Sequence, residues 1–364
     1  MPATTPAVCL TADQERDFLA ACLRAAGTRD DVATAASEQM VDAELRGYGG
    51  HGMIRLPYLI RSLQHGTANG DPQLRTLTDT PSASLIDGDR GLGAFTGRHA
   101  ITLAIAKAEQ CGIGVVGVRN GHYTGRIAYF AQLALDRNMV TVITGSTPPM
   151  VHAYGGSTPS LGTAPLCIAV PSDPTPIVLD MATSLAARGK IMAAQRDGRS
   201  IPSDWAIDPD GSPTTDPDAA LAGALSPFGG AKGGGLSLLL HFLTGPLLGV
   251  RHHTSPDPSL FSGEAVADKG DLYLVIDPAA FGDPATFLAE TRDYASELRA
   301  LPAAPGTDAV RLPGDRAAAL HRERLQGGIP IAAGVWQEAI DIAAGLGVDP
   351  PVEVTDPQEI SKGA

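Results

Sequence analysis

The chain has 364 residues, of which 43% are hydrophobic and 18% charged, as expected for a globular protein with a sizeable core. Its net charge of −13 argues against nucleic acid or an anionic membrane as the main partner, although a local pocket can still hold positive charge. The cysteines Cys9, Cys22, Cys111 and Cys167 have no metal or disulfide spacing, and no segment resembles a signal peptide or a membrane span. We therefore expect a cytoplasmic protein with reduced thiols.

The N-terminal part is predicted to be helical. A capping box at Thr11 and Gln14 begins the first helix, a second is expected over 30–45, and a third helical pattern covers 53–63.

A glycine-rich turn, RGYGGHG, precedes the third pattern and carries His51. Arg55 follows four residues later, so the two side chains would share one face of a helix beginning at Gly52. Arg55 could hold a carboxylate by two contacts while His51 supplies a proton beside it. The alternative is a histidine that caps the helix and an arginine at the surface.

The stretch RNGHYTG joins a predicted buried strand over 115–118 to a helical pattern over 127–135. Its histidine, His122, lies between Gly121 and Gly125, which free the backbone on either side. An imidazole at the exit of a buried strand suits a general acid or base near neutral pH. The alternative is that His122 only hydrogen-bonds the end of its own sheet.

One glycine pattern has a misleading similarity to a dinucleotide fingerprint. A strand is expected over 82–87 and a helix over 98–110; Gly112, Gly114 and Gly117 then match GxGxxG, but inside the next strand. Without a strand before it and a helix after it, the motif predicts no phosphate site, and a standard Rossmann domain is not supported.

The middle of the chain alternates apolar runs with turn-rich loops. Strands covered on both faces are expected over 140–144, 166–170 and 177–179. Asp180 ends the last strand, and Thr183 and Ser184 are predicted to cap a helix that continues to Ile191. That helix start could take a phosphate or carboxylate, or be ordinary capping.

The segment from 201 to 217 is predicted to be a loop over the site, and PFGGAKGGGL then places Lys232 before a helix over 236–248. Lys232 could contact a phosphate or ribose, or it could be a surface lysine in a hinge. The remaining predicted elements are a strand over 271–276, helices over 284–298, 317–325 and 335–344, and a loosely held polar tail. No cluster has metal spacing.

Taken in order, these stretches resemble the malate/L-lactate/L-sulfolactate dehydrogenase family, which also holds ureidoglycolate dehydrogenase, diketogulonate reductase and the piperideine/pyrroline-2-carboxylate reductases. The likeness extends from about Thr11 to about Ile342. It is carried by RGYGGHGMIRLP, RNGHYTG, the turns at Gly155 and Gly162, DMATS, IPSDWAIDPDG, GGAKGGGL and LPGD.

The resemblance implies an α/β fold with a mixed central sheet and helical flanks from both termini, unlike a Rossmann domain, and a homodimer. The implied division is a helical part over 1–75 on the substrate side, a nicotinamide-binding mixed-sheet domain over 76–310, returning helices over 311–350 and a tail over 351–364.

The resemblance also implies roles for individual residues. His122 matches a proton acceptor, His51 a proton donor and Arg55 a carboxylate-binding arginine. The cofactor positions correspond to Ser146, Asp180, Met181, Ala182, Lys232, Gly314, Asp315 and Arg316. The implied reaction moves a hydride between a nicotinamide and the carbon beside a carboxylate, in a 2-oxo or 2-hydroxy acid or an imino acid.

Some positions depart from the family pattern. The usual serine before the histidine is Gly50, GTNP has become GTAP at Ala164, and Ala231 and Gly234 stand in the GGYKGYG stretch. A missing hydroxyl and a roomier pocket favour a bulkier 2-oxo acid or a cyclic or N-substituted imine over pyruvate or oxaloacetate. Arg316 could meet the 2′-phosphate of NADPH, which favours NADPH over NADH, although Asp315 would repel that phosphate if it pointed inwards. The competing interpretation is an inactive ligand-binding relative.

Overall fold

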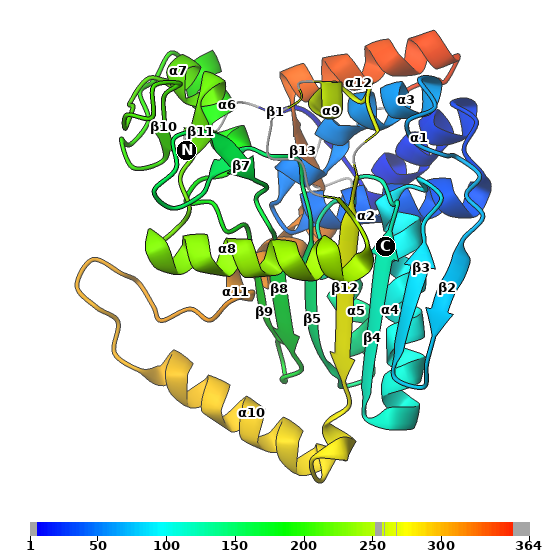
Figure 1. The fold of residues 1–364 in the computed structure, drawn as a ribbon, viewed down its shortest axis with the longest axis vertical. Coiled ribbons are helices and arrows are strands. Elements are labelled where there is room, and N and C mark those ends of the chain that lie inside the picture. The colour runs from blue at the N-terminus through cyan, green and yellow to red at the C-terminus, as the bar shows by residue number, and fades with distance from the viewer. Residues whose placement is uncertain (1–5, 252–256, 258, 267, 352–364) are drawn as a thin grey trace.

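The computed structural model describes residues 6–251, 257, 259–266 and 268–351, and its centre is a seven-stranded sheet (Figure 1). The strands, in spatial order, are β2 (Arg75–Asp79), β3 (Ala83–Asp87), β4 (Ile113–Arg119), β12 (Gly270–Ile276), β5 (Val140–Gly145), β8 (Leu166–Val170) and β9 (Ile177–Met181). Within this sheet β3 and β4 are parallel and the other neighbouring pairs are antiparallel. The predicted mixed sheet is confirmed, and the strand order is not that of a Rossmann domain.

Helices cover both faces of the sheet. They are α4 (Gly93–Cys111) and α5 (Ala128–Leu135) on one face and α8 (Ala231–Thr244) on the other. Because side chains alternate along a strand, Ile143 and Cys167 enter the core under α4 and α5, whereas Val142 and Leu166 pack against Leu240 of α8. Burial on both faces explains why the strands are nearly continuous apolar runs.

The two ends of the chain share a second core. Its elements are α1 (Ala12–Ala25), α2 (Asp30–Leu45), α3 (Leu56–Gln64), α12 (Ala333–Leu346) and the antiparallel pair β1 (Pro6–Leu10) and β13 (Ile329–Ala332). Phe18 of α1 and Trp336 of α12 lie 5.6 Å apart between ring centroids. The helical flanks from both termini are therefore confirmed, and α11 (Asp315–Gly327) packs on α2 beside them.

The described residues also form a smaller sheet and four further α-helices. The sheet has the order β10 (Ala206–Ile207), β11 (Ala224–Leu225), β6 (Val151–His152), β7 (Pro159–Leu161), and three of the helices are α6 (Arg188–Arg196), α7 (Pro217–Ala222) and α9 (Ser259–Ser262). The predicted loop over 201–217 belongs to this part and is mostly turns. Beneath the main sheet, α10 (Pro284–Ala300) lies along the lower end of the molecule (Figure 1).

Two helices begin about five residues earlier than predicted, because glycines near their starts weakened the helical pattern. The helix expected over 98–110 begins at Gly93, and the one expected over 236–248 is α8, which begins at Ala231. A Cβ on Gly93 would lie 2.4 Å from Thr124 Cα, and one on Gly233 would lie 1.8 Å from the Phe228 carbonyl oxygen. The glycines permit this close packing, which outweighs their poor helix propensity.

The predicted capping by Thr183 and Ser184 is wrong. Their hydroxyls donate to carbonyl oxygens, of Thr163 and Ala186, so they do not accept from helical N–H groups. The helix α6 consequently begins at Arg188.

The third predicted helix, over 53–63, is divided. A 3₁₀ turn over Gly49–His51 and another over Met53–Arg55 precede α3. The strands β1, β2 and β13 were not predicted, and neither were the four short strands of the smaller sheet.

The GxGxxG decoy is structural. Gly112 ends α4 in the left-handed region at φ +79°, and Gly114 and Gly117 lie within β4. A Cβ on Gly114 would lie 1.9 Å from the Ala104 carbonyl oxygen, so the glycine serves helix–strand packing. Apart from Pro351, the predicted tail lies outside the described residues. None of the helices in the described part of the chain has the length and apolar content that crossing a membrane requires.

Candidate active site

Tyr123 connects the predicted catalytic residues. Its hydroxyl lies 2.7 Å from Nδ1 of His51, and the two rings are stacked. The Arg55 guanidinium lies over the same ring, 5.3 Å from its centroid. Tyr58 of α3 packs edge-on against Tyr123 and stacks on His122 at 5.5 Å. His51, Arg55 and His122 are therefore brought together, by two tyrosines to which the sequence analysis gave no role.

His122 lies in the loop between β4 and α5, almost fully buried. Its backbone N–H donates to the Gly91 carbonyl at 3.0 Å, and the Tyr123 carbonyl accepts from Gly93 at the start of α4. Its Nδ1 is buried without a hydrogen-bond partner among the described residues. Burial, and then the charge of Lys269, lowers the pKa of His122 to about 4. The imidazole is thus neutral and held by its backbone, and its Nδ1 is not committed to a hydrogen bond within the described part of the chain.

A buried ionic network supports this loop from β12. Lys269 donates to the Thr124 hydroxyl and to the Asp271 carboxylate, and Thr124 donates to the other carboxylate oxygen at 2.9 Å. All three residues are buried. From α2, the Gln39 amide donates to the Thr124 carbonyl at 2.7 Å. The loop that carries His122 is therefore fixed from two elements that are distant in sequence, and Lys269 adds a positive charge near the imidazole.

The turn that carries His51 rests on Glu44. A Cβ on Gly52 would lie 2.1 Å from Glu44 Oε1, whereas one on Gly50 would meet nothing within 4 Å. Arg55 donates to the Gly50 carbonyl at 2.7 Å. Burial, followed by the charges of Arg55 and Arg126, lowers the pKa of His51 to about 4. The space left by the missing serine side chain is therefore open.

The predicted cofactor residues follow one end of the sheet. Ser146 comes directly after β5; its hydroxyl accepts from the Gly270 N–H at 2.9 Å. Asp180 lies near the end of β9, where burial raises its pKa, and its carboxylate is 3.6 Å from Arg126. Met181 ends that strand and Ala182 follows it.

The segment before Lys232 is joined to this end of the sheet by a backbone hydrogen bond. The Phe228 N–H donates to the carbonyl of Thr183, the residue after Ala182, and Lys232 is exposed in the first turn of α8.

The turn Gly314–Arg316 borders the same strand. Gly314 is the N-cap of α11 at φ +97°, and the residue before it accepts from the Val178 N–H of β9. Asp315 accepts two hydrogen bonds from Arg299, at 2.7 and 3.1 Å, which lowers its pKa. Arg316 is exposed. The charge of Asp315 is therefore already balanced.

These features define a class of site. Two neutral imidazoles and an arginine lie around Tyr123, and the carboxylate of Asp180 lies near the end of β9. The described residues contain no group of histidine, cysteine and carboxylate side chains arranged for a metal ion. Such a site can bind a carboxylate and transfer a proton.

Comparison with known proteins identifies the family. The model of the malate/L-lactate dehydrogenase family matches residues 10–339. The L-sulfolactate dehydrogenase of Methanothermobacter thermautotrophicus is 34% identical, covering 93% of this chain and 98% of its own. Two further relatives are the NAD(+) ureidoglycolate dehydrogenase of Escherichia coli, 33% identical (87% and 91% covered), and the NADP(+) (2R)-3-sulfolactate dehydrogenase of Chromohalobacter salexigens, 35% identical (85% and 91%).

Solved structures agree. The sulfolactate dehydrogenase of Methanocaldococcus jannaschii matches with a TM-score of 0.86 and 33% identity, covering 94% of this chain and 98% of that one. The delta1-piperideine-2-carboxylate reductase of Pseudomonas syringae matches at 0.83 and 28%, covering 92% and 99%. The chain belongs to the malate/L-lactate dehydrogenase family, and it is accordingly an oxidoreductase that uses a nicotinamide cofactor.

Proposed function

We propose that the protein transfers a hydride between NAD(P)(H) and the carbon next to a carboxylate, in a 2-oxo or 2-hydroxy acid or a cyclic or N-substituted imino acid. The observation that carries this proposal is the cluster of His51, Arg55 and His122 around Tyr123. An inactive ligand-binding relative would have no need to keep these side chains together.

Each side chain then has a role. Arg55, whose Nε is held by the Gly50 carbonyl, presents its remaining N–H groups to the substrate carboxylate. His122 takes a proton from the substrate hydroxyl or amine during oxidation, or returns one during reduction. His51 either donates a proton to the substrate or, through its hydrogen bond to Tyr123, helps to orient the substrate. The nicotinamide supplies or accepts the hydride.

The cofactor is proposed to lie along the strand ends. Ser146, Asp180, Met181, Ala182 and Lys232 would hold its nicotinamide and phosphates, and Gly314, Asp315 and Arg316 its adenosine end. Relatives use either NAD(+) or NADP(+). Because Arg299 already neutralises Asp315, the objection to a 2′-phosphate weakens, which favours NADPH.

The substrate is proposed to be larger than pyruvate or oxaloacetate. A side chain at Gly50 would enter open space, which a ring or an N-substituent could fill. A piperideine-2-carboxylate reductase among the structural neighbours is consistent with an imine.

The test is nicotinamide absorbance at fixed enzyme. NADPH and NADH are supplied separately with 2-oxo acids and cyclic imino acids, and NADP+ and NAD+ are supplied separately with ureidoglycolate-type hydroxy acids. Oxidation of NADPH with an imine but not its keto acid would make the protein an imine reductase. Pyruvate or oxaloacetate as the best substrate by a wide margin would refute the larger substrate. Silence with both cofactors, and no cofactor binding, would revive the inactive relative.

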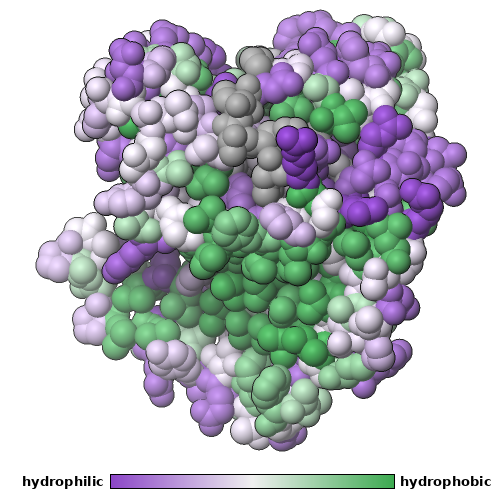
Figure 2. All heavy atoms as spheres, viewed as in Figure 1, coloured by the Kyte–Doolittle hydropathy of each residue, from purple (hydrophilic) through white to green (hydrophobic). Residues whose placement is uncertain are grey.

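We also propose a cytoplasmic homodimer joined through α8. The outer face of α8 and the following turn expose Leu238, Leu239, Phe242, Leu243 and Leu247, which form part of the hydrophobic patch across the middle of Figure 2. Leu239→Glu with Phe242→Glu should convert a dimer to a monomer by light scattering, whereas Phe281→Ser, at an exposed residue away from α8, should not. A wild-type monomer would refute the dimer. The division at residues 75, 310 and 350 also remains a proposal.

A further inference from the structure

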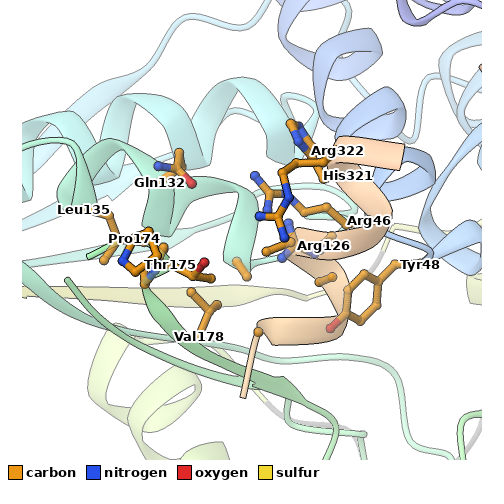
Figure 3. Close-up of a pocket in the computed structure, with 15 residues that line it drawn as sticks. Arg46, Tyr48, Arg126, Gln132, Leu135, Pro174, Thr175, Val178, His321 and Arg322 are labelled. Atoms are coloured by element: carbon orange, nitrogen blue, oxygen red, sulfur yellow. The ribbon is translucent and has the colours of Figure 1, made fainter. Parts of the chain in front are cut away.

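A cavity of about 200 Å³ lies between α5, α11 and the segment that enters β9 (Figure 3). One wall is apolar and includes Leu135, Pro174, Pro176 and Val178. The other end is basic and carries Arg46, Arg126, His321 and Arg322, whose side chains gather in Figure 3. A cavity with one apolar wall and a basic end suits a nucleoside that carries a phosphate.

The basic end keeps a net positive charge. Asp42 accepts from Arg46 Nε at 2.7 Å and from Arg126 at 2.6 Å, and Asp180 lies 3.6 Å from Arg126. Arg322 forms no ion pair with any described residue, and Nε of Arg126 is buried without a hydrogen-bond partner there. Three guanidinium groups therefore face two carboxylates, in a chain whose net charge is −13. This local excess attracts an anion.

The position of the cavity connects it with the cofactor. Gly314, the N-cap of α11, lines it, and Val178 in its wall is two residues before Asp180. The Tyr48 ring, which also lines the cavity, has the Arg126 guanidinium 4.8 Å from its centroid. Arg316, which the sequence favoured for the 2′-phosphate, is not among the residues that line the cavity, whereas Arg46, His321 and Arg322 are.

We propose that this cavity binds the adenosine end of NADP(H) and that Arg322, together with Arg46 and His321, binds its 2′-phosphate. This inference rests on the proposed function. Arg126 and Asp42 hold the walls, since each is already paired with the other. Arg322 is exposed and lines the cavity, so its side chain is accessible to a phosphate there.

The experiment measures binding to the full-length protein by fluorescence titration of NADPH and NADH, and by displacement of NADPH with adenosine 2′,5′-bisphosphate or 5′-AMP. In Arg322→Ser, the ratio of the NADPH to the NADH dissociation constant should rise about tenfold or more, and the bisphosphate should lose its advantage over 5′-AMP. Arg322→Lys should recover part of this. The surface control Arg196→Ser should leave the ratio unchanged.

Equal weakening of NADPH and NADH in Arg322→Ser, or no change in either, would overturn the assignment. So would a change in the ratio caused by Arg316→Ser alone. Inorganic phosphate that raises the melting temperature without competing with NADPH would mean a separate anion site and would also refute it. Wild type that binds neither dinucleotide would instead refute the proposed function.

Discussion

His51 and His122 are both buried imidazoles whose pKa is lowered to about 4, yet their surroundings differ. His51 has a partner for Nδ1, the Tyr123 hydroxyl, and its cationic neighbours are Arg55 and Arg126. His122 has a stacked ring, Tyr58, and an Nδ1 without a partner among the described residues, and its cationic neighbour is Lys269 within a buried ion pair. The two histidines therefore have similar pKa values, although Nδ1 of His51 is hydrogen-bonded to Tyr123 and Nδ1 of His122 has no partner among the described residues.

The difference indicates how the work is divided. A general acid or base must exchange its proton with the substrate during each cycle, which an imidazole with an uncommitted nitrogen can do. A histidine committed to a tyrosine is better suited to orienting the substrate beside Arg55. We therefore expect His122 to carry the proton transfer.

The largest expected effect is that of His122→Ala. Loss of a general acid–base should lower kcat by about 10²- to 10⁴-fold, while NADPH binding stays largely intact. His51→Ala should lower kcat/KM less, mainly through KM for the carboxylate substrate. Steady-state kinetics with fluorescence titration of the cofactor measures both. Normal turnover by His122→Ala would move the acid–base role to His51.

Lys269→Met should change the pH dependence. Burial is the main cause of the low pKa of His122 and Lys269 the second, so removing the cation moves this pKa part of the way back towards 6.5. Oxidation needs the neutral imidazole and is lost as pH falls through its pKa, so it should fail at a higher pH than in wild type. Reduction needs the protonated imidazole and should therefore persist to a higher pH. The charged groups around His122 that bear on this are Lys269, which directly precedes β12, Asp271 within β12, and Arg55 across the tyrosines.

The opposite shifts separate this effect from damage to the fold. A purely structural role for Lys269 would reduce oxidation and reduction alike at every pH. Because Lys269→Met leaves Asp271 buried without its cation, the double variant with Asp271→Asn should show the same opposite shifts with a more stable fold. Lys269→Arg should retain the wild-type profile.

Tyr123→Phe tests the role of the hydrogen bond between Tyr123 and His51. Losing one neutral hydrogen bond should reduce kcat/KM by up to about tenfold, with no shift in the pH profile attributed to His122. Tyr58→Phe keeps the ring that stacks on His122 and should have little effect. If Tyr123→Phe shifted the pH dependence of kcat/KM, His51 would be the group that titrates in the reaction.

The sequence predicted six of the seven strands of the main sheet, because burial on both faces leaves short apolar runs in those strands. The seventh, β2, is exposed along its whole length and leaves no such run. It did not predict that helices begin at Gly93 and Ala231. Glycine disfavours a helix locally. Gly93 is needed because it packs against Thr124, which is distant in sequence, and Gly233 is needed because it packs against Phe228 in the loop before α8. Tertiary packing of this kind leaves no local signal.

The site was predictable to a similar degree. His51, Arg55 and His122 were selected, and the fold brings them together, but Tyr123 and Tyr58 had no local feature that distinguished them from core aromatics. Lys269 and Asp271 did leave a signal: two opposite charges flank a glycine at the start of a strand that is otherwise mostly apolar. A buried strand admits such charges only when they are paired, so that pattern could have predicted the network.

Gly50→Ser has the smallest expected effect, and it changes the substrate pocket next to His51. Because a Cβ there meets nothing within 4 Å, the serine should fold normally and return a hydroxyl to the pocket beside Arg55. The added hydrogen bond should lower KM for a small 2-oxo acid by about two- to tenfold and raise KM for a bulky or cyclic substrate. Gly52→Ser, two residues away, is the control: its Cβ would lie 2.1 Å from Glu44 Oε1, and the overlap should cost about 1–3 kcal/mol of unfolding free energy in urea titration. If Gly50→Ser instead impaired small and large substrates equally, the open space at Gly50 would not be part of the substrate pocket, and the argument for a larger substrate would fail.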